Sequence, residues 1–165
     1  MSGGYNEIHP EPTTFWSKYI ISFDHKVIAK QFLWYGIAFL GIGGLMALLI
    51  RWTLAYPGEA FPVIGHLLFP NSAGIVPPDS YAMLFTMHGT IMIFYAITPI
   101  LIGAFGNYCI PLMIGARDMA FPMLNMLSFW FAFLSGVVLL ASLFLPLGAA
   151  AGGWTSYPTL STMIG

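Results

Sequence analysis

The charged residues of this chain are so widely spaced that they delimit three long apolar segments. Twenty uncharged residues lie between Lys30 and Arg51, 37 lie between Asp79 and Arg117, and no charged residue follows Asp118. A helix needs roughly 20 residues to cross the hydrocarbon core of a bilayer. The pattern therefore predicts transmembrane helices over residues 31–50, 81–106 and 120–147.

The remaining segments are predicted to connect these helices. Proline and glycine are frequent in residues 51–80, and residues 148–165 are rich in Gly, Ser, Thr and Pro, a composition typical of loops. Within the second apolar segment, Pro99 should kink the helix and Pro111 should limit it. The predicted order is an N-terminal segment (1–30), an outer loop (51–80), an inner loop (107–119) and a second outer loop (148–165).

Composition supports a membrane protein. Only 7% of the residues are charged and 58% are hydrophobic, whereas a soluble domain is about 25% charged. The fold class predicted is an all-α membrane protein with three transmembrane helices. The N-terminal stretch MSGGYNEIHPEPTTFW lacks the order of a signal peptide. The single cysteine, Cys109, excludes an internal disulfide and a cysteine-only metal cage, and the net charge of −1 argues neither for nor against nucleic acid.

The basic residues predict an orientation. With three spans, Lys18, Lys26, Lys30 and Arg117 fall on one side of the membrane, and Arg51 falls on the other. Basic residues concentrate on the cytoplasmic side of membrane proteins. The N-terminus is therefore expected in the cytoplasm (or matrix) and the C-terminus outside.

His88 stands in the uncharged stretch YAMLFTMHGTIMIFYAITPI, about 10 Å into the second span. An imidazole at that depth needs a partner. It could donate a hydrogen bond to a carbonyl of a neighbouring helix. It could instead be an axial ligand of a haem iron, with Gly89 allowing a flat macrocycle to approach the backbone.

Arg51 ends the first span on the same side as His88. Such a residue usually extends its charged group to the membrane surface. A buried guanidinium could instead hold polar groups on the rim of a haem. His88 and Arg51 alone leave both interpretations open.

A second polar group brackets the inner loop and consists of Asn107, Asp118 and Asn125. A carboxylate with two amides at the membrane surface could admit protons, with the amides holding a file of waters. The alternative is a solvated loop in which Asp118 caps the following helix and pairs loosely with Arg117. The charge pattern alone favours the solvated loop, although amides inside a membrane are costly without partners.

Five motifs occur in an order and at separations similar to subunit I of the haem–copper terminal oxidases, of the cytochrome c oxidase type. The chain resembles the N-terminal three-helix portion of that subunit, from about Phe15 onward, within a larger polytopic helix bundle. The motifs are FDHKVIAKQF, LLIRWTLAYPG, TMHGTIMIFY, GNYCIPLMIGARDMAFPMLN and GGWTSYPTL.

The resemblance implies roles for individual residues on the outer side. His88 matches an axial ligand of the low-spin haem, and Arg51 matches an arginine that hydrogen-bonds a substituent of that haem. Trp154 matches a tryptophan near the haem propionates, and Tyr157 lies in the same loop. Thr53 stands where many relatives have a glutamate, which weakens any expectation of their alkaline-earth cation site.

On the inner side, the resemblance makes Asp118 the carboxylate at the entrance of a proton pathway. Asn107 and Asn125 match asparagines in the mouth of the same pathway. Arg117 and Met123 depart from the usual surroundings of this carboxylate.

The activity implied by the resemblance is reduction of dioxygen to water with electrons from cytochrome c or a quinol, coupled to proton translocation. The expected cofactors are a low-spin haem, of the heme a type, and a high-spin haem and copper whose ligands come later in the family. Expected partners are the remainder of subunit I, subunits II and III, the electron donor and the bilayer of a bacterial inner membrane, without nucleic acid. The alternative is a cofactor-free three-span scaffold or assembly subunit.

Overall fold

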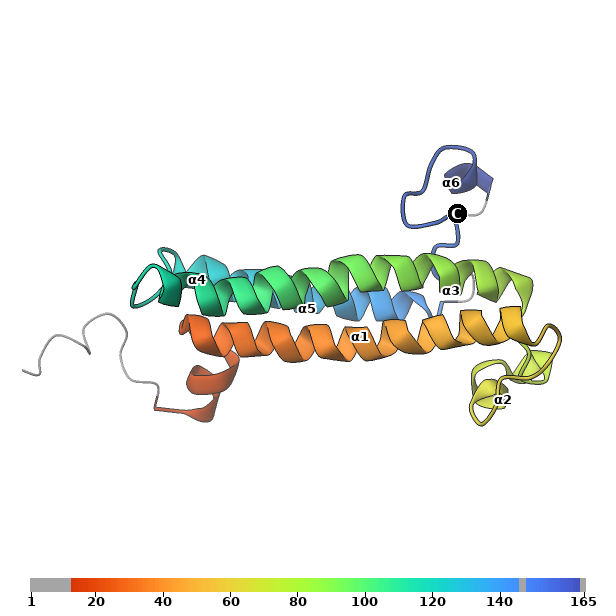
Figure 1. Cartoon of the computed structure of the whole chain (residues 1–165), viewed down its shortest axis with the longest axis horizontal. Coiled ribbons are helices and arrows are strands. Elements are labelled where there is room, and N and C mark those ends of the chain that lie inside the picture. The colour runs from red at the N-terminus through yellow and green to blue at the C-terminus, as the bar shows by residue number, and fades with distance from the viewer. Residues whose placement is uncertain (1–12, 146–147, 164–165) are drawn as a thin grey trace, which may run out of the picture.

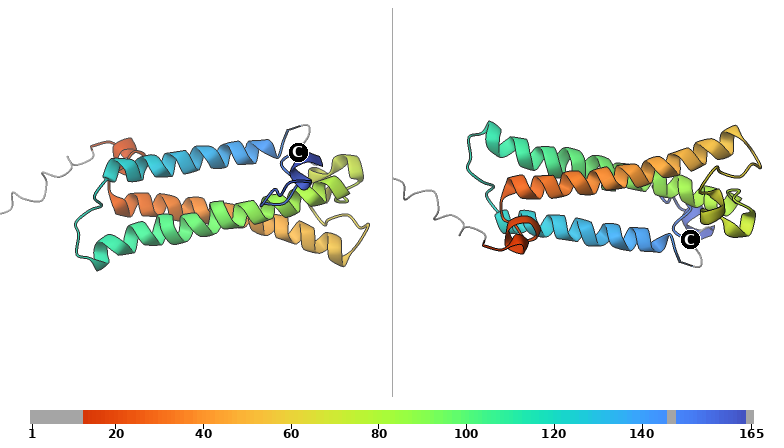
Figure 2. Two further views of the ribbon diagram at one scale, coloured as in Figure 1. Left: turned by 90° about the horizontal axis from the view of Figure 1, so that it is seen from above. Right: turned by 90° about the horizontal axis from the view of Figure 1, so that it is seen from below.

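Three long helices lie side by side in a computed structural model that describes residues 13–145 and 148–163 (Figure 1). Helices that are long and apolar enough to cross a membrane span His25–Ala55, Pro78–Met113 and Pro122–Ser142, and the described residues contain no strand. The predicted all-α membrane fold with three spans is confirmed. The two views of Figure 2 show the second span against the first along its length and the third alongside.

The first span is helix α1, His25–Ala55, which begins where Asp24 accepts a hydrogen bond from the Lys26 N–H at 2.8 Å. It extends past the apolar segment 31–50 at both ends. Charged residues mark where a segment leaves the hydrocarbon, but they do not end a helix, because lysine and arginine are good helix formers. A short π-helical turn, η1 (Trp16–Ile20), precedes α1.

The second span is one continuous helix made of α3 (Pro78–Thr90), η3 (Ile91–Ile97), η4 (Pro99–Gly106) and α4 (Asn107–Met113). It passes the expected boundary at residue 106 by seven residues, so the inner loop is shorter than expected. Pro111 lies inside α4, and the helix ends two residues later. Around Pro99, which has no N–H to donate, the backbone takes wider π-type hydrogen bonding in η3 and η4.

The third span is α5, Pro122–Ser142, which is shorter than the predicted 120–147. Short elements lie in the connections at the opposite end of the bundle from η1 (Figure 1). They are α2 (Gly65–Leu68), η2 (Pro70–Ser72) and α6 (Leu160–Met163).

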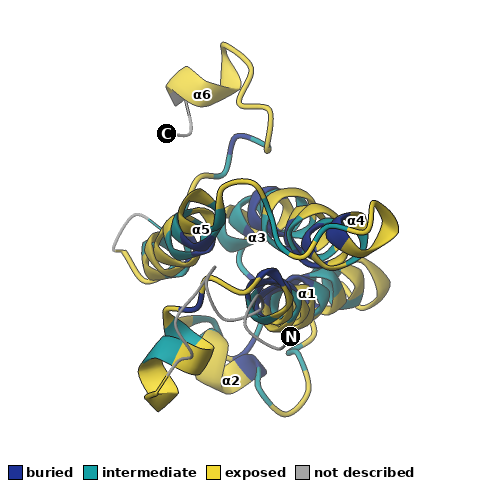
Figure 3. Ribbon diagram, turned by 90° about the vertical axis from the view of Figure 1, so that its left-hand side faces the viewer, coloured by how far each residue is buried: buried dark blue, intermediate teal, exposed yellow. Residues whose placement is uncertain are grey.

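Much of the apolar surface of the bundle faces outward, as Figure 3 shows by the exposed positions along the helices. The side chains of Trp34, Ile102, Phe131 and Val138 are at least two-thirds exposed. Such a surface suits lipid or further helices, since neither requires polar groups. The core lies between α1 and its two neighbours and contains Phe32, Tyr35, Phe39, Ile91 and Phe129.

Glycines allow the first two spans to approach closely. A Cβ at Gly36 would lie 2.5 Å from Ile100 Cγ1 and 3.2 Å from the Ala96 carbonyl oxygen. Because the carbonyl belongs to the backbone, a rotamer change cannot relieve the clash. Gly41, on the same helix, would meet no atom within 4 Å.

Gly36→Ala is therefore expected to destabilise the bundle by about 1–3 kcal/mol, the usual cost of overpacking. Gly41→Ala is the matched control and should be neutral or slightly stabilising, because alanine favours helix. Thermal unfolding of the purified protein in detergent measures both. Equal unfolding midpoints for the two variants would contradict the close approach at Gly36.

Candidate functional site

The imidazole of His88 is hydrogen-bonded across the interface between the first two spans. Its Nδ1 lies 2.9 Å from the carbonyl oxygen of Gly43 on α1. A carbonyl only accepts, so Nδ1 carries the hydrogen, and in the neutral ring Nε2 then has the lone pair. This bond fixes the ring and its tautomer, as hydrogen bonds from the second nitrogen do in metal-ligating histidines. The carbonyl partner and the ligand role, which the sequence presents as alternatives, are thus compatible.

The second outer loop packs against the helix that carries His88. The Gly153 N–H donates to Thr86 Oγ1 at 2.9 Å. A Cβ at Gly89 would lie 3.5 Å from Trp154 Cδ1, and the rings of Trp154 and Phe94 are 6.0 Å apart. The structure therefore brings Trp154 close to the backbone next to His88. The Tyr157 side chain is 69% exposed and has no contact with His88 among the hydrogen bonds and ring pairs of the described residues.

Arg51 lies on α1 eight residues after Gly43, about 12 Å farther along the helix. Its side chain is exposed, and it has no hydrogen bond or ion pair with any described residue. The structure places Arg51 toward the same end of the bundle as His88 but does not bring the two side chains into contact.

Asp118 lies at the other end of the bundle, where it pairs with a histidine that sequence reasoning missed. Its Oδ1 is 3.1 Å from His25 Nδ1 and also accepts the Met119 N–H at 2.7 Å. The Asp118 side chain is 17% exposed and that of His25 is 3% exposed. A carboxylate that is within reach of water is thus in contact with a buried imidazole.

The expectation that Asp118 caps the third span is wrong. The N-cap residue of α5 is Phe121, with no side-chain capping bond, and Pro122 begins the helix. Proline is common at the first helical position, because the N–H that it lacks would have no partner within the helix. The chain therefore continues for three residues after Asp118 before α5 begins, and the carboxylate points to α1 instead.

The two asparagines of the inner side meet each other. Asn107 Nδ2 donates to Asn125 Oδ1 at 2.9 Å, and the Asn107 side chain is buried between α4 and α5. Asn125 Nδ2 and His25 Nε2 are buried and have no hydrogen-bond partner among the described residues. Buried polar atoms of this kind usually bind ordered water or another protein segment.

The signal for His25 was present in the sequence but weak. His25 lies between Asp24 and Lys26, and a polar stretch of this kind is typical of the solvated start of a helix. Its predicted location on the same side as Asp118 is what could have identified it. The contact itself joins residues 93 positions apart, which local patterns do not reveal.

Comparison with known proteins gives one consistent family. A sequence model described as Cytochrome C and Quinol oxidase polypeptide I matches residues 27–164. Cytochrome c oxidase subunit 1 of Thermostichus vulcanus is 45% identical over 155 residues, covering 94% of this chain and 25% of that protein. The same subunit of Bacillus sp. (strain PS3) is 47% identical over 143 residues, covering 87% and 21%. The heme-copper oxidase subunit I+III of Aeropyrum pernix is 43% identical over 147 residues, covering 89% and 16%. The chain spans about a quarter or less of the length of these relatives.

Thr86→Val should loosen the loop that holds Trp154, because it removes the acceptor of the Gly153 N–H. Loss of one hydrogen bond corresponds to about fivefold faster amide exchange at Gly153. Thr90→Val is the matched control, since among the described residues the Thr90 hydroxyl bonds only to the Thr86 carbonyl of its own helix. Hydrogen–deuterium exchange of peptides covering residues 148–160 measures the effect. Equal exchange in the two variants would contradict the docking of this loop through Thr86.

Proposed function

This chain belongs to the cytochrome c and quinol oxidase polypeptide I family, and we propose that it forms the N-terminal portion of the catalytic subunit of a haem–copper respiratory oxidase. The complete enzyme would reduce dioxygen to water with electrons from cytochrome c or a quinol and would translocate protons. The partners of this portion would be the remainder of subunit I and subunits II and III.

The observation that carries the proposal is the hydrogen bond that holds the His88 ring in place. Its Nδ1–H is bound to the Gly43 carbonyl, and Nε2 has no hydrogen-bond partner among the described residues. An imidazole held in this way suits iron. Gly89 adds no side chain beside it. These residues fit one axial ligand of a low-spin haem, of the heme a type, which when bound would accept and pass on single electrons.

Three further residues are proposed to surround that haem. Trp154, next to Gly89, would lie on the side of the propionates, with Tyr157 in the same loop. Arg51 would offer its guanidinium to a polar substituent of the haem, which suits its exposed side chain at the same end of the bundle. A nearby positive charge of this kind tunes a haem's electronic properties without ligating the iron.

Replacing His88 tests the proposal directly. In the assembled oxidase, His88→Met should abolish or markedly shift the absorption band of the low-spin haem, because it replaces the ligating nitrogen. His66→Ala is the matched control, since His66 is exposed in α2. Reduced-minus-oxidised optical spectra give the readout. An unchanged low-spin band in the fully assembled His88→Met complex would reject the ligand role, and a colourless wild-type complex would instead favour a scaffold subunit.

The opposite end of the bundle is proposed to take up protons. Lys18, Lys26, Lys30 and Arg117 belong to this end and Arg51 to the other, which favours a cytoplasmic location for the N-terminal end in a bacterial inner membrane. Asp118 would accept protons from water at this surface.

His25, in contact with Asp118, would hold the carboxylate in place. The paired amides of Asn107 and Asn125 would hold water by hydrogen bonds. The support for this role is that the carboxylate is partly exposed whereas its partner is buried, so one side of the pair meets solvent and the other meets the protein interior.

Asp118→Asn should slow oxygen consumption by about tenfold or more and reduce proton pumping, while the haems stay bound. Asparagine keeps the shape of the side chain but cannot carry the negative charge or exchange the proton. Asp79→Asn is the matched control, because Asp79 is an exposed carboxylate in the first turn of α3, at the opposite end of the bundle from His25 and Asp118. Oxygen uptake and proton release by reconstituted vesicles provide the measurement. Wild-type turnover and stoichiometry in Asp118→Asn would exclude this residue as the entrance.

A further inference from the structure

An apolar groove lies between η1 and the beginning of α5. It is lined by Trp16, Ile20, Ile21, Met126 and Trp130, and its volume is about 330 Å³. Both views in Figure 2 show the red-orange turn of η1 beside the first turns of α5. The surface of the groove is apolar, because the Nε1 of Trp130 is buried away from it, so the groove suits a hydrocarbon ligand. Its volume is at the lower end of the range of roughly 300–1,000 Å³ found for small-molecule sites.

The groove is built by specific bonds that hold η1 in place. Gln31, on α1, donates from Nε2 to the Tyr19 carbonyl at 2.7 Å and to the Ile20 carbonyl at 2.9 Å. These carbonyls end a helical turn and would otherwise lack partners. At the start of the turn, the Thr14 and Ser17 hydroxyls bond to each other and to the backbone. The wall that η1 provides is therefore ordered without a ligand.

Aromatic side chains surround this part of the chain at the end of the bundle. Phe15 and Trp16 are each 66% exposed, and Tyr19 and Phe23 are also exposed. Tryptophan and tyrosine concentrate at the level of the lipid headgroups, where an apolar ring meets a wet surface. The position of η1 at the end of three apolar helices therefore indicates the membrane interface, where lipid chains are the most abundant apolar ligand.

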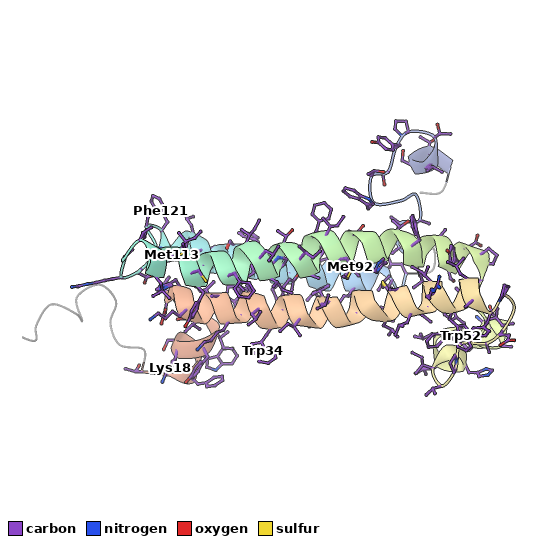
Figure 4. The ribbon with its side chains drawn as sticks, viewed as in Figure 1. Lys18, Trp34, Trp52, Met92, Met113 and Phe121 are labelled. Carbon is purple, nitrogen blue, oxygen red and sulfur yellow. The ribbon has the colours of Figure 1, made fainter. Side chains whose placement is uncertain are left out.

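The charge around the groove is positive. Lys18 lies within η1, with its Nζ 5.3 Å from the Tyr19 ring centroid, and Lys26 and Lys30 are exposed in the first turns of α1. Figure 4 shows Lys18 at the end of the bundle that also carries Met113 and Phe121. Of the acidic side chains at this end among the described residues, Asp24 caps α1 and Asp118 bonds His25. Basic residues near a membrane surface attract anionic lipids.

We infer that this groove binds one acyl chain of an anionic phospholipid, such as phosphatidylglycerol, from the leaflet at the lysine-bearing end. The headgroup phosphate would interact with Lys18 and Lys26, and the chain would lie between Trp16 and Trp130. A bound lipid would fasten η1 to α5, which otherwise belong to distant parts of the sequence. This inference depends on the membrane fold and is independent of the haem and proton proposals.

The test uses the complete oxidase reconstituted in phosphatidylcholine nanodiscs. A trace of phosphatidylglycerol or phosphatidylcholine that carries a diazirine in one acyl chain is added, and labelled peptides are identified by mass spectrometry after illumination. The phosphatidylglycerol probe should label peptides covering residues 13–23 and 122–131 more strongly than the phosphatidylcholine probe. Lys18→Gln should lower this labelling about fivefold, the effect of one basic residue at a membrane surface.

A second variant tests the groove itself. Ile21→Trp fills the groove and should lower labelling by both probes, whereas Leu134→Trp on the exposed face of α5 is the matched control and should leave it unchanged. The haem spectrum and the yield of each variant verify that the complex has assembled. Because the Lys18 side chain is exposed, the Lys18→Gln variant tests the inference without disturbing packing. Equal labelling by the two probes that is insensitive to Lys18→Gln would overturn the inference in favour of general lipid contact. Absence of labelling at both peptides would overturn it in favour of a protein segment in the groove.

Discussion

The constraint on which this structure depends is that polar groups inside a bilayer find no water and must be satisfied by the protein. Four side chains in or near the spans meet this constraint in the same way, by bonding to another element. His88 bonds the Gly43 carbonyl, Tyr35 donates to the Ala132 carbonyl at 2.8 Å, Asn107 bonds Asn125, and Gln31 bonds the end of η1. The bonds of His88 and Tyr35 join elements that are far apart in the chain, and the other two bonds join consecutive elements. The polar residues therefore determine how otherwise uniform apolar helices are positioned.

Small residues make these bonds possible, because a short hydrogen bond between helices requires their backbones to approach. The Gly43 carbonyl accepts the hydrogen bond from His88. A Cβ at Gly43 would lie 2.7 Å from Met92 Sδ, so a larger residue would not fit here. Gly136 likewise leaves room for the Tyr35 hydroxyl, which reaches the α5 backbone nearby. In a bilayer, apolar burial contributes little to helix association, so close packing and such bonds contribute most of it.

The sequence was sufficient for the number of spans, which the structure confirms, and for the family, which the comparisons confirm. It was insufficient for the ends of the helices. Gaps between charged residues measure the hydrocarbon thickness, whereas α1 continues through lysines and an arginine into the interface, and the second span passes Pro111. The contact between His25 and Asp118 was also out of reach, because it depends on how α1 and the loop before α5 meet in space. Local capping rules suggested that Asp118 caps the following helix, whereas α5 begins only at Pro122 and its N-cap residue is Phe121.

The two candidate sites are separated along one helix, and this separation limits what the chain can do. His88 and Asn107 lie 19 residues apart on the second span, about 28 Å. The side chains between them that carry hydroxyls are Thr90, Tyr95 and Thr98. The threonine hydroxyls donate to carbonyls of their own helix, and the Tyr95 ring packs on Phe39. The side chains of this helix therefore do not form a continuous series of free polar groups between His88 and Asn107. A proton taken up at Asp118 would have to continue along polar groups of other helices, which fits a chain that matches only about a quarter of its relatives' length.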